Sequence, residues 1–274
     1  MHKASELQSF LKELGVDARK GLSQNFLIDG NILRKIADAA HVKAGDSILE
    51  IGPGPGALTE LLLERGAHVT AIELDAVFAH ALERLQTQDQ RLHVFATDFL
   101  KFPLQEFLIK NPGPWKVVAN LPYHITTPIL TQLLPCHGAI ESVTIMVQKE
   151  VAKRMVSSHG SADYGSFSLF VSFYSKASYC FTVEPTCFYP KPTVQSAVVH
   201  CQLHAPHPIS STEDFFRLTR TAFQQRRKML RSSLKELYSQ EKIISSLMQL
   251  GLKETARPEE LSLAQFLQLF TLMN

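Results

Sequence analysis

The sequence has few of the features that mark extracellular, metal-binding or membrane proteins. Its 274 residues include only four cysteines, none of them in a C-x-x-C pair, and its histidines are scattered without the spacing of metal ligands. Sparse, unpaired cysteines are typical of a reducing compartment. No apolar run approaches the length of a membrane-spanning helix, and the first residues lack the apolar stretch of a signal peptide. We therefore expect a cytoplasmic protein without a metal site.

A strong overall charge is also missing. Apolar residues make up 45% of the chain and charged residues 20%, with a formal net charge of +2. This composition is typical of a globular protein, here one large domain with a small companion. The charge is uneven, however, because the segment from Glu213 to Lys235 carries seven basic residues and two acidic ones. Such a run suits an RNA-binding or phosphate-binding face, although a solvated helix surface explains it as readily.

The order of the expected elements indicates an α/β fold with a parallel, doubly wound sheet. Strands and helices alternate over residues 47–148. The expected strands are Ser47–Ile51, His68–Glu73, Leu92–Ala96, Trp115–Ala119 and Val143–Gln148. The expected helices are Ala57–Arg65, Ala76–Gln86 and Thr127–Leu134, with a further short helix over Ser5–Gly15. In such sheets ligands bind at the carboxyl ends of the strands.

The pattern changes after this region. Phe167–Tyr174, Ser178–Val183 and Ala197–Leu203 have strand character with no long helix between them, which predicts antiparallel pairing. A proline-containing stretch, 204–210, indicates a linker. Amphipathic helical segments follow at Thr212–Phe223, Arg226–Tyr238, Glu241–Leu250 and Pro258–Leu272. We therefore divide the chain into an N-terminal helical segment (1–45), a sheet domain (46–204) and a small helical domain (211–274).

Glycines and acids at three successive strand ends predict a site for a nucleoside-containing cofactor. The first strand runs into Gly52-Pro53-Gly54-Pro55-Gly56, where the absence of Cβ atoms lets a ligand approach the backbone. The G-x-G-x-G spacing and the missing proline amides suit S-adenosylmethionine, which has no phosphate, better than a dinucleotide. Glu73 can accept from ribose hydroxyls and Asp98 from an adenine amine. We expect Gly52, Gly54, Glu73 and Asp98 to bind the cofactor, although each acid alone could be a helix cap or a surface carboxylate.

Asn120-Leu121-Pro122-Tyr123 follows the fourth strand and suits chemistry on an aromatic amine. The lone pair of an adenine N6 is delocalised, which makes the amine a poor nucleophile. Acceptors aimed at its two N–H bonds favour a pyramidal nitrogen that can attack a sulfonium methyl. The Asn120 oxygen and the carbonyl of Leu121 or Pro122 could supply them, while Tyr123 offers a face on which a flipped base can stack. The alternative is a plain turn with a core tyrosine.

This motif resembles that of the amino-methyltransferases with an (N/D)PPY-type sequence, and other segments narrow the resemblance to the ribosomal RNA adenine N6,N6-dimethyltransferases. These segments are Ala18–Lys20, Gln24–Leu27, Glu50–Gly54, Ile72–Asp75, Val147–Val151, Phe188–Pro192, Ser196–Val199, Phe223–Lys228 and Arg257–Ser262. The resemblance covers nearly the whole chain and is strongest to the bacterial small-subunit enzymes. It implies a Rossmann-like S-adenosylmethionine-dependent methyltransferase sheet with a small all-helical C-terminal domain.

The resemblance also implies roles for further residues. Asn25 and Leu27 would close over the cofactor, Asn120 would contact it as well, and Phe188 would face Tyr123 across the target base. The C-terminal domain would bind RNA. The expected phosphate contacts are Arg226, Arg227, Lys228, Arg154 and Arg257, and for any one of them a solvated surface role is an equal alternative.

The implied reaction is the dimethylation of two adjacent adenosines near the 3′ end of 16S ribosomal RNA during ribosome biogenesis. The expected partners are small-subunit rRNA and the pre-30S particle, and we expect a monomer. Ser23 departs from the glycine that the family usually has before Gln24, which leaves the shape of that loop open.

Other functions stay open. An adenine methyltransferase of large-subunit rRNA or of DNA is disfavoured by the compact helical tail and by the Phe223–Lys228 motif. A noncatalytic assembly factor is disfavoured by the intact Asn120–Tyr123 motif and by the cofactor acids, which a pure binder would not need. An unrelated nucleotide-binding α/β domain would require all these motifs to coincide.

Overall fold

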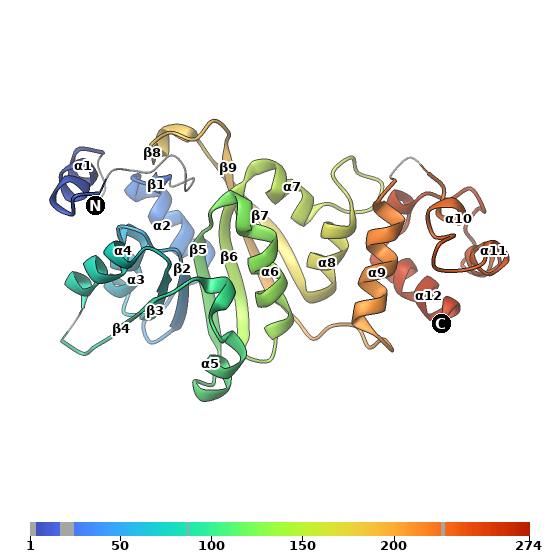
Figure 1. Ribbon diagram of the computed structural model, residues 1–274, viewed down its shortest axis with the longest axis horizontal. Helices are drawn as coiled ribbons and strands as arrows, with labels where there is room; N and C mark the ends of the chain where they lie inside the picture. Colours follow the sequence, from blue (N-terminus) through green and yellow to red (C-terminus); the bar gives the residue numbers. More distant parts are fainter. Residues whose placement is uncertain (1–3, 17–24, 87, 226–227) are drawn as a thin grey trace. The chain divides into compact units, whose positions relative to one another are not determined.

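The computed structural model describes residues 4–16, 25–86, 88–225 and 228–274, and the chain forms two compact units (Figure 1). The first unit comprises 1–152 and 178–204, and the second comprises 153–177 and 205–274. The boundary after His204 coincides with the expected linker. The segment 153–177, assigned to the sheet domain on sequence, instead belongs to the second unit, because aromatic rings such as Phe173 pack against Phe216 there.

Seven strands form one sheet in the order β4-β3-β2-β5-β6-β9-β7. The strands are β2 (Ser47–Ile51), β3 (His68–Glu73), β4 (Leu92–Ala96), β5 (Trp115–Asn120), β6 (Ile140–Gln148), β7 (Ser175–Val183) and β9 (Ser196–Leu203). The first five in this order pair in parallel, whereas β9 runs antiparallel to β6. The expected parallel sheet is therefore confirmed, and of the segments expected to pair antiparallel, β9 does so with β6. A separate two-stranded sheet pairs β1 (Phe26–Leu27) with β8 (Phe188–Tyr189).

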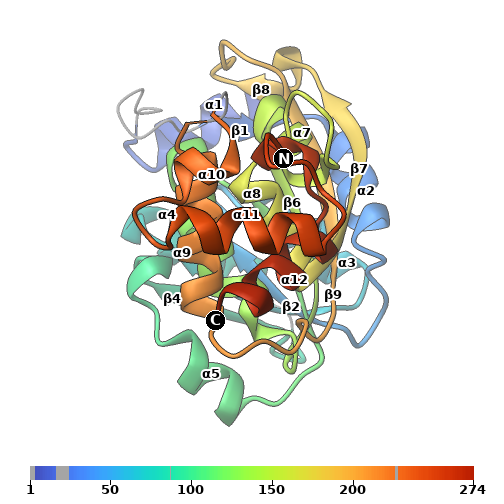
Figure 2. The same cartoon turned by 90° about the vertical axis from the view of Figure 1, so that its right-hand side faces the viewer.

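Helices cover both faces of the parallel part of the sheet. In Figure 2, α2 (Gly30–Ala39) and α3 (Ala57–Glu64) lie on one side and α5 (Leu104–Lys110) on the other. Buried leucines such as Leu33 and Leu62 pack α2 and α3 against Ile48 and Val69 of the sheet. The remaining helices of this region are α1 (Ala4–Glu13), α4 (Ala76–Ala81), α6 (Thr126–Leu133) and α7 (Lys149–Val156). In the described part of the chain, no helix is long and apolar enough to cross a membrane.

The second unit is helical, with an aromatic core. Its main helices are α8 (Ser166–Tyr174), α9 (Thr212–Phe223), α11 (Gln240–Gln249) and α12 (Leu263–Met273). The ring of Phe215 lies 5.4 Å from that of Phe173 and 5.6 Å from that of Phe270, measured between centroids. These contacts join α8, α9 and α12, so the expected small helical domain is present and contains α8 as well.

Two expected elements are wrong. Phe167–Tyr174 is helix α8 rather than a strand, because an almost continuous apolar run does not distinguish a buried strand from a buried helix. The expected helix over Arg226–Tyr238 is reduced, among its described residues, to the four-residue α10 (Leu230–Ser233). Met229 before it is extended, and two serines within it have weak helix propensity.

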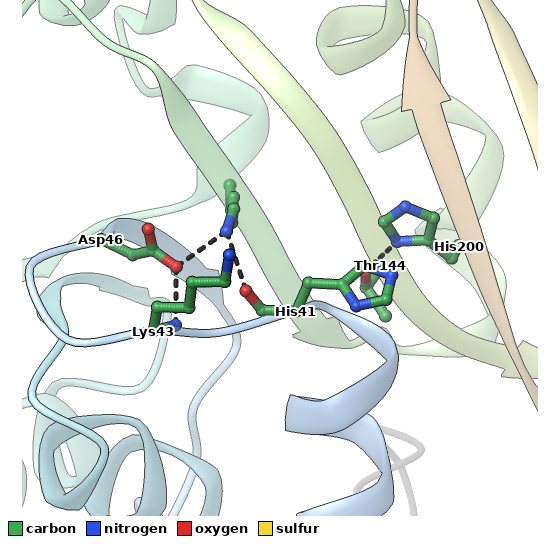
Figure 3. Close-up of polar contacts among 6 residues, drawn as sticks. His41, Lys43, Asp46, Thr144 and His200 are labelled. Atoms are coloured by element: carbon green, nitrogen blue, oxygen red, sulfur yellow. Dashed lines mark hydrogen bonds and ion pairs between the residues drawn. The ribbon is translucent and has the colours of Figure 1, made fainter.

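A buried lysine links strand β5 to the loop between α2 and β2, at the amino end of the sheet. Lys116 of β5 is 8% exposed, and its Nζ donates to Asp46 Oδ2 at 2.8 Å and to the His41 carbonyl at 2.9 Å. The same Asp46 oxygen accepts the N–H of Lys43. Figure 3 shows these groups beside the hydrogen bond between Thr144 and His200. The contacts fasten the loop that follows α2 to the first residues of β2 and β5.

We expect Lys116→Ala to lower the free energy of unfolding by about 2–3 kcal/mol, because Asp46 loses its charged partner while it stays three-quarters buried. Urea unfolding at neutral pH measures this. Lys43→Ala is the matched control, since only its backbone N–H contacts Asp46, and it should change stability by less than about 0.5 kcal/mol. Equal effects of the two substitutions would contradict a role for the buried ion pair.

Candidate active site

A cavity of about 460 Å³ lies at the carboxyl ends of β2, β3 and β5, a size typical of small-molecule sites. Its wall contains all the residues expected to bind a cofactor: Asn25, Leu27, Gly52, Gly54, Glu73, Asp98 and Asn120. Leu121, Pro122 and Tyr123 also line it. The parallel topology explains this gathering, since neighbouring parallel strands end at one edge of the sheet.

The N-terminal segment supplies part of this wall. Leu7 of α1 lines the cavity together with Asn25 and Leu27. Leu7 and Leu11 pack on Phe78 of α4 and thereby hold α1 beside the site. The motif residues 18–20 and 24 and the atypical Ser23 lie outside the described residues, so the expectation that this loop closes over a cofactor stays a prediction.

The glycine loop has a backbone shape that other residues would adopt only with strain. Gly52 has φ +67° and Gly54 has φ +54°, both in the left-handed region. A Cβ atom on Gly54 would also lie 3.2 Å from the ring of Phe26. The loop therefore presents bare backbone to the cavity, as the motif predicts.

Glu73 joins this loop to the next strand end. Its Oε2 accepts the Gly54 N–H at 2.9 Å, and its Oε1 accepts the Asp75 N–H at 2.8 Å. The residue is 7% exposed, and burial raises the pKa of its carboxyl, against the backbone N–H groups of Asp75, Gly54 and Leu74, which lower it. Each oxygen keeps a lone pair for a ligand hydroxyl. Asp98 is half-buried, and its Oδ1 accepts the N–H of Leu100.

A second buried acid, Glu50, was not among the expected site residues. It lines the cavity, is 1% exposed, and its Oε2 has no hydrogen-bond partner among the described residues. Burial raises the pKa of its carboxyl to about 8, against the Thr59 hydroxyl, which lowers it, and the nearby charge of Glu73 adds to the rise. The signal in the sequence is a lone acid inside an apolar strand, directly before the glycines. An uncompensated carboxyl in a cavity wall suits a cationic ligand.

Asn120 and the turn after it leave two acceptors for a substrate amine. The Asn120 Nδ2 donates to the Asn25 carbonyl at 3.4 Å, so the Oδ1 is the acceptor of this side chain. The Pro122 carbonyl accepts from the Ile125 N–H and the Thr126 hydroxyl, at 3.2 and 3.4 Å, which engages both its lone pairs. The sequence left open whether the carbonyl of Leu121 or that of Pro122 accepts an N–H of the substrate amine, and the geometry favours the carbonyl of Leu121.

The two aromatic residues expected to hold a base have different surroundings. Tyr123 is half-buried at the cavity, its hydroxyl lies 2.7 Å from Ser196 Oγ, and burial raises its pKa. Phe188 is 2% exposed in the core beside Leu27 and is not among the cavity-lining residues. A stacking role for Phe188 stays a prediction, and it requires the ring to leave this position.

The expected RNA contacts are partly described. Arg226 and Arg227 lie outside the described residues. Arg154, Lys228 and Arg257 are exposed, and all three belong to the second unit. Exposure agrees with phosphate contacts and equally with solvated side chains, so these assignments stay predictions.

Comparisons with known proteins agree with the chemistry of this site. The family model described as Ribosomal RNA adenine dimethylase matches residues 15–274. A Protochlamydia amoebophila protein named Ribosomal RNA small subunit methyltransferase A is 50% identical over 273 residues, which covers 98% of this chain and 96% of the relative. A Chlamydia muridarum protein of the same name is 48% identical over 272 residues, with the same coverage.

Two solved structures are similar over most of their length. A dimethyladenosine transferase from Plasmodium falciparum matches with a TM-score of 0.77 and 25% identity, over 89% of this chain and 95% of that chain. The 23S rRNA methyltransferase ErmE matches with a TM-score of 0.69 and 26% identity, over 91% and 99%. The Rossmann-like methyltransferase fold is therefore confirmed.

We expect Glu50→Gln to stabilise the ligand-free protein increasingly as the pH rises. The folded protein keeps the Glu50 proton up to a pH of about 8, because burial raises its pKa, whereas an unfolded chain releases it near 4.5. The wild type therefore loses stability between these values, and glutamine does not.

Urea unfolding at about pH 5 and about pH 8 should show a gain for Glu50→Gln of about 2–3 kcal/mol at the higher value and little at the lower. Glu64→Gln, on the exposed side of α3, is the control and should show no such trend. A gain independent of pH would contradict a buried, protonated Glu50.

Proposed function

The chain belongs to the ribosomal RNA adenine dimethylase family, and from this premise we propose that it dimethylates the N6 amines of adenosines in small-subunit (16S) ribosomal RNA with S-adenosylmethionine. The observation that carries the proposal is the Asn120–Tyr123 turn, whose residues line the same cavity as Glu50 and Glu73. An aromatic amine substrate needs such acceptors, and a cationic nucleoside cofactor needs such acids.

The residues of the cavity fit S-adenosylmethionine. Its two ribose hydroxyls suit the remaining lone pairs of Glu73, and its adenine amine suits Asp98. Its positive sulfonium suits a cavity whose wall buries Glu50 with the Oε2 atom unpartnered among the described residues. The cofactor supplies an electrophilic methyl group, and the chain supplies the binding and the orientation.

The chain's part in the reaction is to orient the amine. The Asn120 Oδ1 and the Leu121 carbonyl would accept the two N6–H bonds and direct the nitrogen lone pair away from the ring. The face of Tyr123 would hold the flipped adenine. No strong general base is required, because the amine becomes acidic once it is methylated. Catalysis then depends on positioning and on preorganised acceptors.

The finer features of the substrate follow from the resemblance. We propose that the targets are two adjacent adenosines near the 3′ end, in the precursor of the small subunit, and that the enzyme acts as a monomer in the cytoplasm. The relatives at 50% and 48% identity carry a small-subunit name, whereas ErmE, at 26%, carries a large-subunit one. This difference favours small-subunit rRNA over large-subunit rRNA as the substrate.

Methyl transfer from labelled S-adenosylmethionine to unmethylated small subunits is the direct test, with the product nucleosides identified by mass. We expect N6,N6-dimethyladenosine at two adjacent positions. Labelling of large subunits or of DNA alone would assign a different substrate. Tight binding of small subunits without any transfer would support a noncatalytic assembly factor.

Asn120→Ala is expected to lower kcat by about 100-fold or more, because the amine loses one acceptor in the transition state. The affinity for RNA should change little, as filter binding can measure. Asn111→Ala, at an exposed asparagine that follows α5, is the matched control. Wild-type turnover in Asn120→Ala would refute the acceptor role.

A further inference from the structure

Strand pairing places Ser196 at the same edge of the sheet as the methyl-transfer residues. It is the first residue of β9, and because β9 is antiparallel to β6 it pairs with Gln148, the last residue of β6. β6 is in turn parallel to β5, where Asn120 pairs with Met146. The beginning of β9 and the end of β5 therefore lie at one edge, although the two are far apart in sequence.

The Ser196 hydroxyl forms a hydrogen bond with the Tyr123 hydroxyl. The two oxygens are 2.7 Å apart, Ser196 is fully buried, and Tyr123 lines the cavity. The backbone next to Ser196 is also held, because the Gln195 carbonyl accepts the Lys149 N–H at 3.0 Å and the Gln195 side chain accepts from Lys149 Nζ at 2.8 Å. The anchor is thus held by its neighbours, whereas the residue that it contacts belongs to the cavity wall.

We propose that Ser196 is a positioning residue, which fixes the direction in which the Tyr123 ring extends so that the target adenine stacks in the place required for methyl transfer. The side chain is attached to the turn at one end and hydrogen-bonded to Ser196 at the other, so the swing of the ring about the Cα–Cβ bond is restricted before any base arrives. A restricted ring lowers the entropy cost of the correct stacking geometry. The proposal rests on the proposed function, and it gives the Tyr123 hydroxyl a role beside that of the ring face.

A double-mutant cycle tests this proposal, since the hydrogen bond can be removed from either side. Tyr123→Phe and Ser196→Ala should each lower kcat by about 3- to 10-fold with little change in KM, the loss expected from one neutral hydrogen bond. The double variant should be no slower than the slower single variant. Tyr123→Ala, which also removes the ring face, should be slower than all of these.

Ser142→Ala is the matched control, because Ser142 is also a buried serine of the same strand pair but lies near the beginning of β6. It should keep the wild-type kcat. A wild-type kcat in Ser196→Ala would overturn the proposal. So would a double variant whose loss equals the product of the two single losses, since the hydroxyls would then act independently.

A measurement without turnover separates this proposal from the proposed function. The chain has six tyrosines, so protein labelled with 3-fluorotyrosine should give six fluorine resonances, of which Tyr123 is the one missing in Tyr123→Phe. Ser196→Ala should shift this resonance and Ser142→Ala should not. An unshifted Tyr123 resonance would overturn the positioning role. Absence of methyl transfer by the wild type, with the shift observed, would instead overturn the proposed function.

Discussion

The carboxylate of Glu73 joins two strand ends, and the shape of the cavity depends on this bridge. One oxygen holds the glycine loop that follows β2 through Gly54, and the other holds the start of α4 through Asp75. The bridge is possible because β2 and β3 are parallel neighbours in matched register, with Ile51 opposite Ile72. Hydrogen bonds from backbone N–H groups to a carboxylate are stronger than those between neutral groups, so this one side chain sets the position of a loop and of a helix. The ligands of the proposed cofactor are arranged around that fixed point.

The same edge of the sheet buries two carboxyls, and this arrangement is costly without a cation. Glu50 and Glu73 are 1% and 7% exposed, and the charge of Glu73 adds to the effect of burial on the pKa of Glu50. Burial of an unpaired acid opposes folding, so a chain that keeps one at a cavity wall gives up stability there. A positively charged ligand compensates for this loss by favouring the ionised carboxyl. The acids thus suit a positively charged sulfonium better than a neutral nucleoside, which the shape of a glycine loop alone does not provide.

The sequence predicted the parallel part of the fold well, because its strands are short apolar segments that end at glycines or polar residues. β2, β3 and β4 have the expected bounds, and β5 is one residue longer. Glu73, Asp98 and the glycines lie in the cavity wall for the same reason, since their places at strand ends follow from chain order, whereas Glu50 was missed. The failures are α8, whose apolar run has no clear period, and residues whose role depends on distant partners. Nothing local in the sequence reveals that one oxygen of Glu50 has no partner among the described residues or that Phe188 is buried beside Leu27.

Ser196 is another residue whose proposed role depends on partners that are distant in the sequence. Its position opposite Gln148 is set by the register of β9 against β6, and both faces of this strand pair are largely buried. The paired residues Thr144 and His200 reinforce the register, because their side chains are bonded at 2.8 Å (Figure 3). Side chains alternate between the two faces of a strand, so a slip of one residue would bring Gln195 or Ala197 to the place of the Ser196 hydroxyl. Neither can replace a short, buried hydroxyl beside Tyr123. The orientation of the stacking ring is therefore determined by strand pairing in the core as much as by the motif that contains it.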